Sequence, residues 1–177
     1  LLGTEFVPKA DFSETYVGFY TPVGSSLEVT EAKVKQVEAI IREFPETKYT
    51  LSTINTGNAG GKNNASVYIR LTDRKDRTRN VDELSGVLRD RLKQVAGITV
   101  TQAGLVDPVG GQKQIEFSLQ GPNQQELERL AQTVFDKIRN IPGLVDLDSS
   151  VKANKPTIKV DVKRDVASDL GMGIAQI

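Results

Sequence analysis

The chain contains few side chains that could carry out covalent chemistry. Among its 177 residues there is no His and no Cys. Ser-His and Cys-His nucleophile pairs, zinc fingers, iron–sulfur clusters and disulfide frameworks are therefore excluded. The Ser and Thr hydroxyls have no histidine base to activate them. We therefore expect no catalytic residues and no enzyme activity.

Carboxylates are the remaining groups that could form a reactive or metal-binding site. Five of them gather in the C-terminal part of the chain: Asp146, Asp148, Asp161, Asp165 and Asp169. A calcium or magnesium loop needs closely spaced ligands, as in D-x-D-x-D-G. Asp146 and Asp148 instead lie on one polar face of a predicted strand with no further ligand near in sequence. We expect no metal site and no cofactor.

A glycine-rich segment, Thr56–Asn64, separates two predicted strands. It fails as a phosphate loop because Gly61-Lys62 lacks the Walker spacing and the segment opens a strand rather than a helix. The sequence alone favours a mobile hairpin connection. The other interpretation is a gating or binding loop, since long glycine-rich loops inside compact units often serve such functions.

The charge distribution argues against a nucleic-acid partner. The chain has 23 Lys and Arg and 23 Asp and Glu, so its formal net charge is zero, whereas nucleic-acid binding needs a basic face. An RNA-recognition sheet would need an aromatic–Gly–aromatic strand, and the strand around Tyr68 offers one aromatic. The basic stretch from Arg70 to Arg79 contains Asp73 and Asp76, which predicts a solvated, self-paired turn more than a basic patch.

Three helices are predicted from apolar spacing and from capping residues. The first follows Ser25, which has capping-box spacing to Glu28, and ends at Pro45. The second begins at Asn80 and the third at Asn123, each with a Glu three residues later. A fourth helix is predicted near residues 164–165. No run of about 20 apolar residues predicts a membrane span.

Seven segments of alternating polarity are predicted as strands, and their order gives the fold class. They are residues 15–21, 49–54, 65–71, 98–101, 114–119, 144–148 and 157–162. The expected fold is α+β, with two ferredoxin-like βαββαβ subdomains. The first covers residues 1–106, a linker covers 107–112, and the second covers 113–177 as an incomplete βαββα unit that lacks its last strand. We expect the parent chain to continue and to supply that strand.

Several segments resemble one family of transporters. Residues 2–11 (LGTEFVPKAD) and 22–30 (PVGSSLEVT) resemble the start of the second large periplasmic loop of resistance-nodulation-division (RND) efflux transporters of the AcrB-like hydrophobe/amphiphile type. Residues 141–150 and 161–172 are similar to the second C-terminal porter subdomain of that family. The resemblance covers the whole chain. It implies a fragment holding two C-terminal porter subdomains, the second interrupted by an insertion.

The resemblance also implies a function. In this family the expected role is proton-driven export of drugs or other amphiphilic compounds by a homotrimer. The pump works with a periplasmic adaptor (membrane fusion) protein and an outer-membrane channel, and this segment lies on the periplasmic side of the Gram-negative inner membrane. The implied switch loop is Thr56, Gly57, Asn58, Ala59, Gly60 and Gly61. The implied lining of the substrate entrance cleft is Tyr16, Gly18, Tyr20, Thr99 and Thr101, which share a face by period two, with Asp148 and Ser150 across the cleft.

Departures from the family pattern bear on the substrate. Thr56, Asn58, Thr99 and Thr101 stand where drug pumps of this type often carry aromatic residues, so we expect a more polar substrate. One Met and no His or Cys disfavour the heavy-metal branch, because soft cations need such ligands. Two other interpretations stay open: a stand-alone, ACT-like ligand-sensing module of two ferredoxin-like units, and a membrane-protein scaffold that has lost transport.

Overall fold

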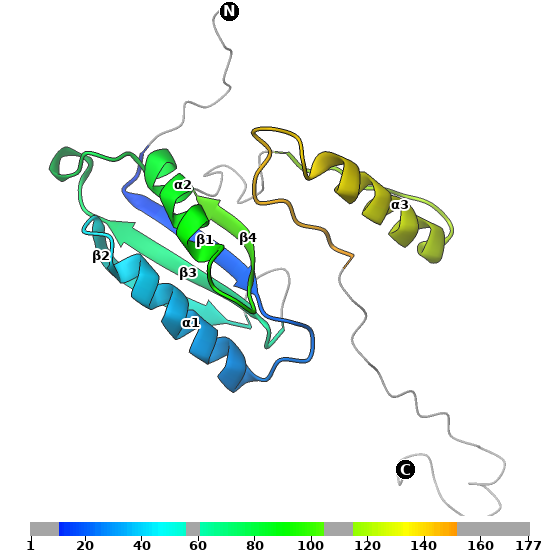
Figure 1. Ribbon diagram of the computed structural model, residues 1–177, viewed down its shortest axis with the longest axis horizontal. Coiled ribbons are helices and arrows are strands. Elements are labelled where there is room, and N and C mark those ends of the chain that lie inside the picture. Colours follow the sequence, from blue (N-terminus) through cyan, green and yellow to red (C-terminus); the bar gives the residue numbers. More distant parts are fainter. Residues whose placement is uncertain (1–10, 56–60, 105–114, 152–177) are drawn as a thin grey trace, which may run out of the picture.

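The computed structural model describes residues 11–55, 61–104 and 115–151. We call residues 11–104 the N-terminal region and residues 115–151 the C-terminal region. The described elements are β1 (Glu14–Tyr20), α1 (Leu27–Arg42), β2 (Thr47–Ile54), β3 (Asn64–Leu71), the short 3₁₀ helix η1 (Arg74–Asp76), α2 (Val81–Leu92), β4 (Thr99–Gly104) and α3 (Gln124–Ile138) (Figure 1).

The N-terminal region forms one four-stranded antiparallel sheet in the order β2-β3-β1-β4. Central strands β1 and β3 pair with Val17 opposite Val67, and β4 pairs with the other side of β1. Helices α1 and α2 pack on the same face of this sheet (Figure 1). This is the ferredoxin-like βαββαβ arrangement, and the predicted α+β class is confirmed.

The core lies between that face and the two helices. On β1 and β3 every second side chain is buried, as period-two alternation requires. Each helix adds a stripe of buried residues three or four positions apart. The largest fully buried apolar residues are Val17, Phe19, Val37, Ile41, Val67, Ile69, Leu71, Val81, Leu84, Leu88 and Leu92. Each such side chain contributes about 1.5–3 kcal/mol relative to exposure, so this region has a substantial core of its own.

The helix starts follow the capping residues, with one correction. The Asn80 side chain accepts a hydrogen bond from the Glu83 amide at 2.8 Å, and the Glu83 carboxylate accepts one from the Asn80 amide at 2.9 Å. Asn123 also caps its helix as predicted. The prediction for the first helix was wrong by one residue, because Ser26 rather than Ser25 accepts from an amide of the first turn.

The charged connection between β3 and α2 is exposed at residues 73–76, as predicted, but Arg77 and Arg79 pair with carboxylates outside the turn and not with Asp73 and Asp76. The Arg77 side chain is 1% exposed, ion-pairs with Asp11, and donates to the carbonyls of Thr72 and Arg79 at 3.1 and 2.6 Å. Arg79 binds both carboxylate oxygens of Glu46 at 2.6 and 2.8 Å. A buried guanidinium needs many acceptors, which backbone carbonyls and carboxylates from other segments supply here.

Asp11 joins the first described residues to α2. Its carboxylate accepts from the amides of Ser13 at 3.0 Å and Val81 at 3.2 Å, in addition to its ion pair with Arg77. Burial acts to raise the pKa of Asp11, but the hydrogen bonds from Ser13, Arg77 and Val81 outweigh it, so the net shift is downward. Since Val81 is the first residue of α2, this carboxylate also occupies the positive end of the helix dipole.

The C-terminal region contains α3 but not the strands predicted beside it. Residues 115–119 and 144–148 are not in strand conformation, so these two strand predictions were wrong for the described residues. In a ferredoxin-like sheet both segments would pair with the strand predicted at residues 157–162. That strand and the predicted fourth helix lie outside the described residues. A strand needs a partner for its backbone groups.

Candidate functional site

The sheet of the N-terminal region has a second face, opposite to the one that α1 and α2 cover. On this second face Tyr16, Gly18 and Tyr20 of β1 are half-buried, and they alternate with residues that point into the core. Tyr49 and Leu51 of β2 are 54% and 62% exposed. The second face therefore combines aromatic and apolar surface that the core does not use.

The structure brings the five predicted residues of the N-terminal region together on this second face. Tyr20 lies opposite Thr99 in the pairing of β1 with β4. A register shift next to Gly18 places Thr101 beside it, with the Thr101 Oγ1 3.2 Å from the position that a Cβ at Gly18 would occupy. Gly18 thus leaves room for the Thr101 hydroxyl, and any larger residue would displace it.

An aromatic cluster on the same face was missed by the sequence analysis. The Tyr16 and Tyr68 rings lie 5.2 Å apart at 64°, and the Tyr49 and Tyr68 rings lie 6.2 Å apart at 46°. Leu51 stands opposite Tyr68 in the strand register. Part of the signal was present, because alternation along β2 puts Tyr49 and Leu51 on one face of that strand, and alternation along β3 puts Tyr68 on the face opposite the buried Val67 and Ile69. Tyr68 was considered only as an RNA-binding aromatic.

A charged pair borders this aromatic cluster. The Tyr68 hydroxyl donates to the Glu14 carboxylate at 2.9 Å, and Arg70 approaches the same carboxylate at 3.7 Å. The pKa of Tyr68 is raised, first by burial and then by the hydrogen bond to Glu14 and its negative charge. The phenol therefore stays protonated at neutral pH. The cluster presents aromatic rings with one hydroxyl already fixed in orientation.

The predicted switch loop lies almost wholly outside the described residues. Of Thr56, Gly57, Asn58, Ala59, Gly60 and Gly61, the structure describes only Gly61, whose φ of 149° suits glycine. Beyond it, the buried Asn63 accepts through its carbonyl from the Thr21 amide at 2.8 Å and donates from its side chain to the Thr21 carbonyl at 3.1 Å. The loop therefore returns to the sheet directly beside the end of β1.

The two predicted lining residues of the C-terminal region are placed differently from the other five. Asp148 and Ser150 are exposed. Asp146 of this segment does reach the N-terminal region, because its carboxylate binds Arg89 of α2 and the amide of Ala103 in β4. Asp161, Asp165 and Asp169 lie outside the described residues.

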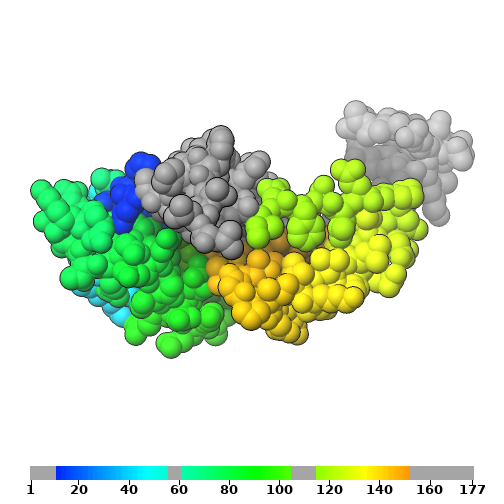
Figure 2. Space-filling view, turned by 90° about the horizontal axis from the view of Figure 1, so that it is seen from above, coloured from blue at the N-terminus to red at the C-terminus, as the bar shows by residue number. Residues whose placement is uncertain are grey.

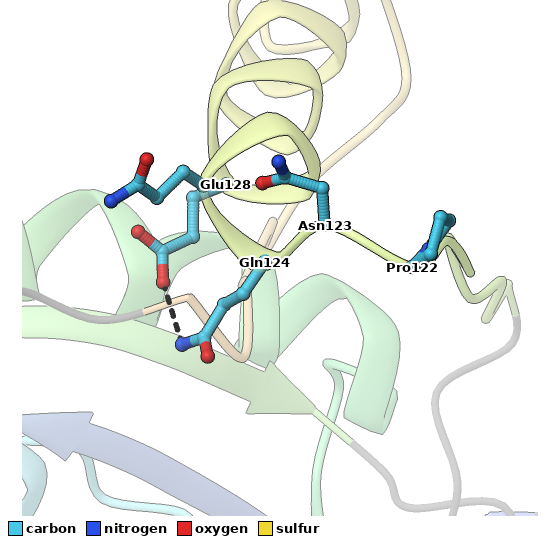
Figure 3. A pocket seen from close by; sticks show the side chains of 5 residues that line it. Pro122, Asn123, Gln124 and Glu128 are labelled. Carbon is cyan, nitrogen blue, oxygen red and sulfur yellow. Dashed lines mark hydrogen bonds between the residues drawn. The ribbon is translucent and has the colours of Figure 1, made fainter.

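Two surface hollows in the described parts of the chain are lined by residues other than the predicted ones. One lies at the start of α3, between Pro122, Asn123, Gln124, Gln125 and Glu128, where Gln124 donates to Glu128 at 3.0 Å (Figure 3). The other lies near Pro45 and Arg77, beside the ion pairs already described. The first is lined mostly by polar side chains. Within the described ranges no group of three or more Asp or Glu could hold a metal ion.

The model of the AcrB/AcrD/AcrF family matches residues 1–177. The chain belongs to the AcrB/AcrD/AcrF family. This confirms the resemblance to RND transporters, which are a transporter family rather than an enzyme class, and supports it over a stand-alone sensing module. None of the described helices is long and apolar enough to cross a membrane.

Relatives of this family member are much longer than the chain. Protein HelA of Legionella pneumophila is 22% identical over 189 residues, an alignment that covers 99% of this chain and 18% of HelA. Two crystal structures of a heavy metal efflux pump, in crystal forms I and II, each match with a TM-score of 0.79 at 18% identity. These matches cover 97% of this chain and 19% of the pump. The chain thus spans about a fifth of these relatives, and at this identity the structural likeness shows the fold alone.

Proposed function

We propose that this chain is a periplasmic porter segment of a proton-driven RND exporter, and that the second face of its sheet lines part of the substrate path. The observation that carries the proposal is the family match over all 177 residues. Within that match, the second face is the described surface that holds the predicted lining residues of β1 and β4. In this proposal residues 1–106 and 113–177 are two porter subdomains joined by residues 107–112.

We propose amphiphilic compounds with polar groups as the substrates. Tyrosine presents an apolar ring and a polar tip, so Tyr16, Tyr49 and Tyr68 suit ligands that have both characters. Thr99 and Thr101 add hydroxyl groups at the neighbouring strand. Planar cationic dyes, which depend on stacking, are expected to be exported less well than amphiphiles that also form hydrogen bonds.

Heavy-metal export is a second candidate, because the two similar crystal structures are those of a heavy metal efflux pump. This chain would contribute little to binding a soft metal ion, because it has no His, no Cys and one Met. Under this alternative the metal ligands would be supplied by other parts of the parent protein. The aromatic cluster on the second face would then have no direct contact with the substrate.

The remaining proposals concern the whole pump. By family membership we propose a homotrimer in the inner membrane, with a periplasmic adaptor protein and an outer-membrane channel as partners. Residues Thr56–Gly61 would act as the loop that separates outer and inner binding pockets. After this loop, Asn63 hydrogen-bonds to Thr21, the residue that follows β1. The described end of the loop therefore lies near Tyr20 of the second face.

An export assay with the full-length parent transporter separates these candidates. The transporter is expressed in an efflux-deficient Gram-negative host. The resistance of the host is then measured against a series of amphiphiles and against Zn²⁺, Cu²⁺ and Ag⁺. We expect amphiphile resistance that Tyr68→Ala reduces and Tyr68→Phe largely keeps. Lys35→Ala, on the exposed surface of α1, is the matched control. Resistance to the metals alone, unaffected by Tyr68→Ala, would overturn the amphiphile proposal.

A further inference from the structure

The segment after α3 is joined to the N-terminal region by a compact cluster of Arg89, Asp146 and Ala103. Asp146 Oδ1 accepts from Arg89 Nε at 2.7 Å, and Asp146 Oδ2 accepts from Arg89 Nη2 at 2.8 Å. Asp146 Oδ2 also accepts from the Ala103 amide at 2.9 Å, while Arg89 Nη2 donates to the Ala103 carbonyl at 2.6 Å. Each member therefore bonds to both of the others.

The cluster covers one edge of the sheet. Strand β4 is the last strand on its side, and Ala103 stands opposite Val17 of β1. Backbone groups on an edge strand lack a neighbouring strand to pair with. Here the amide and the carbonyl of Ala103 are both satisfied by side chains, one from α2 and one from the C-terminal region.

The Arg89–Asp146 pair is also more sheltered than the ion pairs along α3. The Arg89 and Asp146 side chains are 20% and 16% exposed, whereas Arg129 and Glu126 on α3 are 66% and 53% exposed. A sheltered, bidentate pair is stronger and more directional than an exposed single contact. In the described parts of the chain, the other ion pairs each lie within one region.

The backbone around Asp146 is shaped to present this carboxylate. Asp146 has a φ of 54°, in the left-handed region, and Gly143 three residues earlier has a φ of 84°. Asp and Asn enter this region more readily than other non-glycine residues. Figure 2 shows the orange end of the C-terminal region lying against the green surface of the N-terminal region.

We propose that Asp146 is a positioning residue that docks the C-terminal region on the edge of β4. It thereby sets where Asp148 and Ser150 stand relative to Thr99 and Thr101. The docking itself follows from the contacts of the Arg89–Asp146–Ala103 cluster. Its consequence for transport rests on the proposed function, in which these residues line the substrate path.

A distance measurement between the two regions tests the docking in the 177-residue chain. The chain has no Cys, so Lys35→Cys and Arg129→Cys introduce two unique spin-label sites on exposed helix positions. We expect one narrow distance distribution for the otherwise unchanged chain and a broad, longer one for Asp146→Asn. Asn keeps the left-handed backbone but offers one acceptor oxygen where Asp146 offers two. Asp136→Asn, which removes an exposed carboxylate of α3, should leave the distribution narrow.

Hydrogen exchange at Ala103 is the second readout. Its amide should exchange about tenfold faster or more in Asp146→Asn, because a hydrogen bond to a charged acceptor is lost. Core amides of β1 and β3 should be unaffected, since Asp146 contributes nothing to that core. Arg89→Lys should give an intermediate rate, because Lys keeps the charge and loses the two-pronged geometry.

Transport by the full-length parent protein completes the test. If Asp146→Asn broadens the distance distribution and lowers export of an amphiphile at equal protein level, both proposals are supported. If it broadens the distribution and leaves export unchanged, the docking role stands and the proposed lining role of this segment is overturned. An unchanged distance distribution together with unchanged Ala103 exchange overturns the docking proposal, whatever the transport result.

Discussion

The N-terminal and C-terminal regions contain amphipathic helices of the same kind, with very different burial. In the N-terminal region α2 packs Leu84, Leu88 and Leu92 into the core. In the C-terminal region α3 carries an apolar stripe just as regular, and none of its residues is buried. Leu88 is 2% exposed and Leu130 is 41% exposed. The difference shows that periodicity defines which side of a helix can be buried, whereas burial itself requires a sheet to pack against.

The largest effect should separate these two helices directly. Leu88→Ala should lower the free energy of unfolding by about 2–5 kcal/mol, because it removes a fully buried side chain and leaves a cavity. Leu130→Ala should cost less than about 1 kcal/mol, since much of that side chain is already exposed. Urea unfolding of the 177-residue chain, followed by circular dichroism, measures both. Equal costs would mean that α3 is packed as firmly as α2.

Ion pairs offer the second contrast. Arg77→Ala should destabilise the chain by about 3 kcal/mol, because it removes a buried guanidinium, takes the buried ion-pair partner from Asp11 and leaves the carbonyls of Thr72 and Arg79 without that donor. Arg129→Ala, in an exposed pair on α3, should change stability by less than about 0.5 kcal/mol. The same urea series gives both values. A small effect of Arg77→Ala would show that water replaces the guanidinium at no great cost.

The helix caps form a third matched pair. Asn80→Ala should cost about 1 kcal/mol of the free energy of unfolding, because the Glu83 amide loses its side-chain acceptor at the start of a helix that is part of the core. Asn123→Ala should reduce the helicity of α3 and leave the main transition unmoved. Chemical-shift measurements along both helices check this. A shift of the main transition by Asn123→Ala would show that α3 unfolds together with the N-terminal region.

The smallest predicted effect is the change in the free energy of unfolding with pH. The pKa of Glu46 is lowered, first by its hydrogen bond from Arg79, and that of Asp11 is lowered overall as described above. A depressed pKa in the folded state stabilises the fold above the unfolded value, and this contribution is lost as the pH falls through the folded value. Stability of the N-terminal region should therefore decline below about pH 4. Glu46→Gln should show a shallower acid decline, and an unchanged slope would contradict this assignment.

Much of the N-terminal region could be predicted from the sequence. Alternation placed Tyr16, Gly18 and Tyr20 on one face, and the asparagine caps located α2 and α3. What could not be predicted was long-range pairing. Arg77 pairs with Asp11 and Arg79 pairs with Glu46, although these partners are far apart in sequence. The carboxylates within the turn had instead suggested local ion pairs. Charge spacing along a chain does not reveal which groups the fold will bring together.

The candidate site was predicted in the same uneven way. Tyr16, Gly18 and Tyr20 share a face of β1, as strand periodicity predicts, whereas a register shift between β1 and β4, which the sequence does not signal, brings Thr101 beside Gly18. Tyr49 and Leu51 were missed because their closeness to Tyr68 depends on the register of β2 against β3, which a bulge after Thr47 shifts. Asp146 was considered only as a metal ligand. Its role in joining the two regions depends on a left-handed backbone turn that no motif signals.

Helix α2 is held at both ends by carboxylates from outside it. At its first residue the amide of Val81 binds Asp11, and near its end Arg89 binds Asp146. The two attachment points are eight residues apart, or about 12 Å along a helix. Because a packed helix resists bending and stretching, α2 forms a rigid connection between these two attachment points. The helix therefore keeps its attachment points to Asp11 and to Asp146 at a fixed separation.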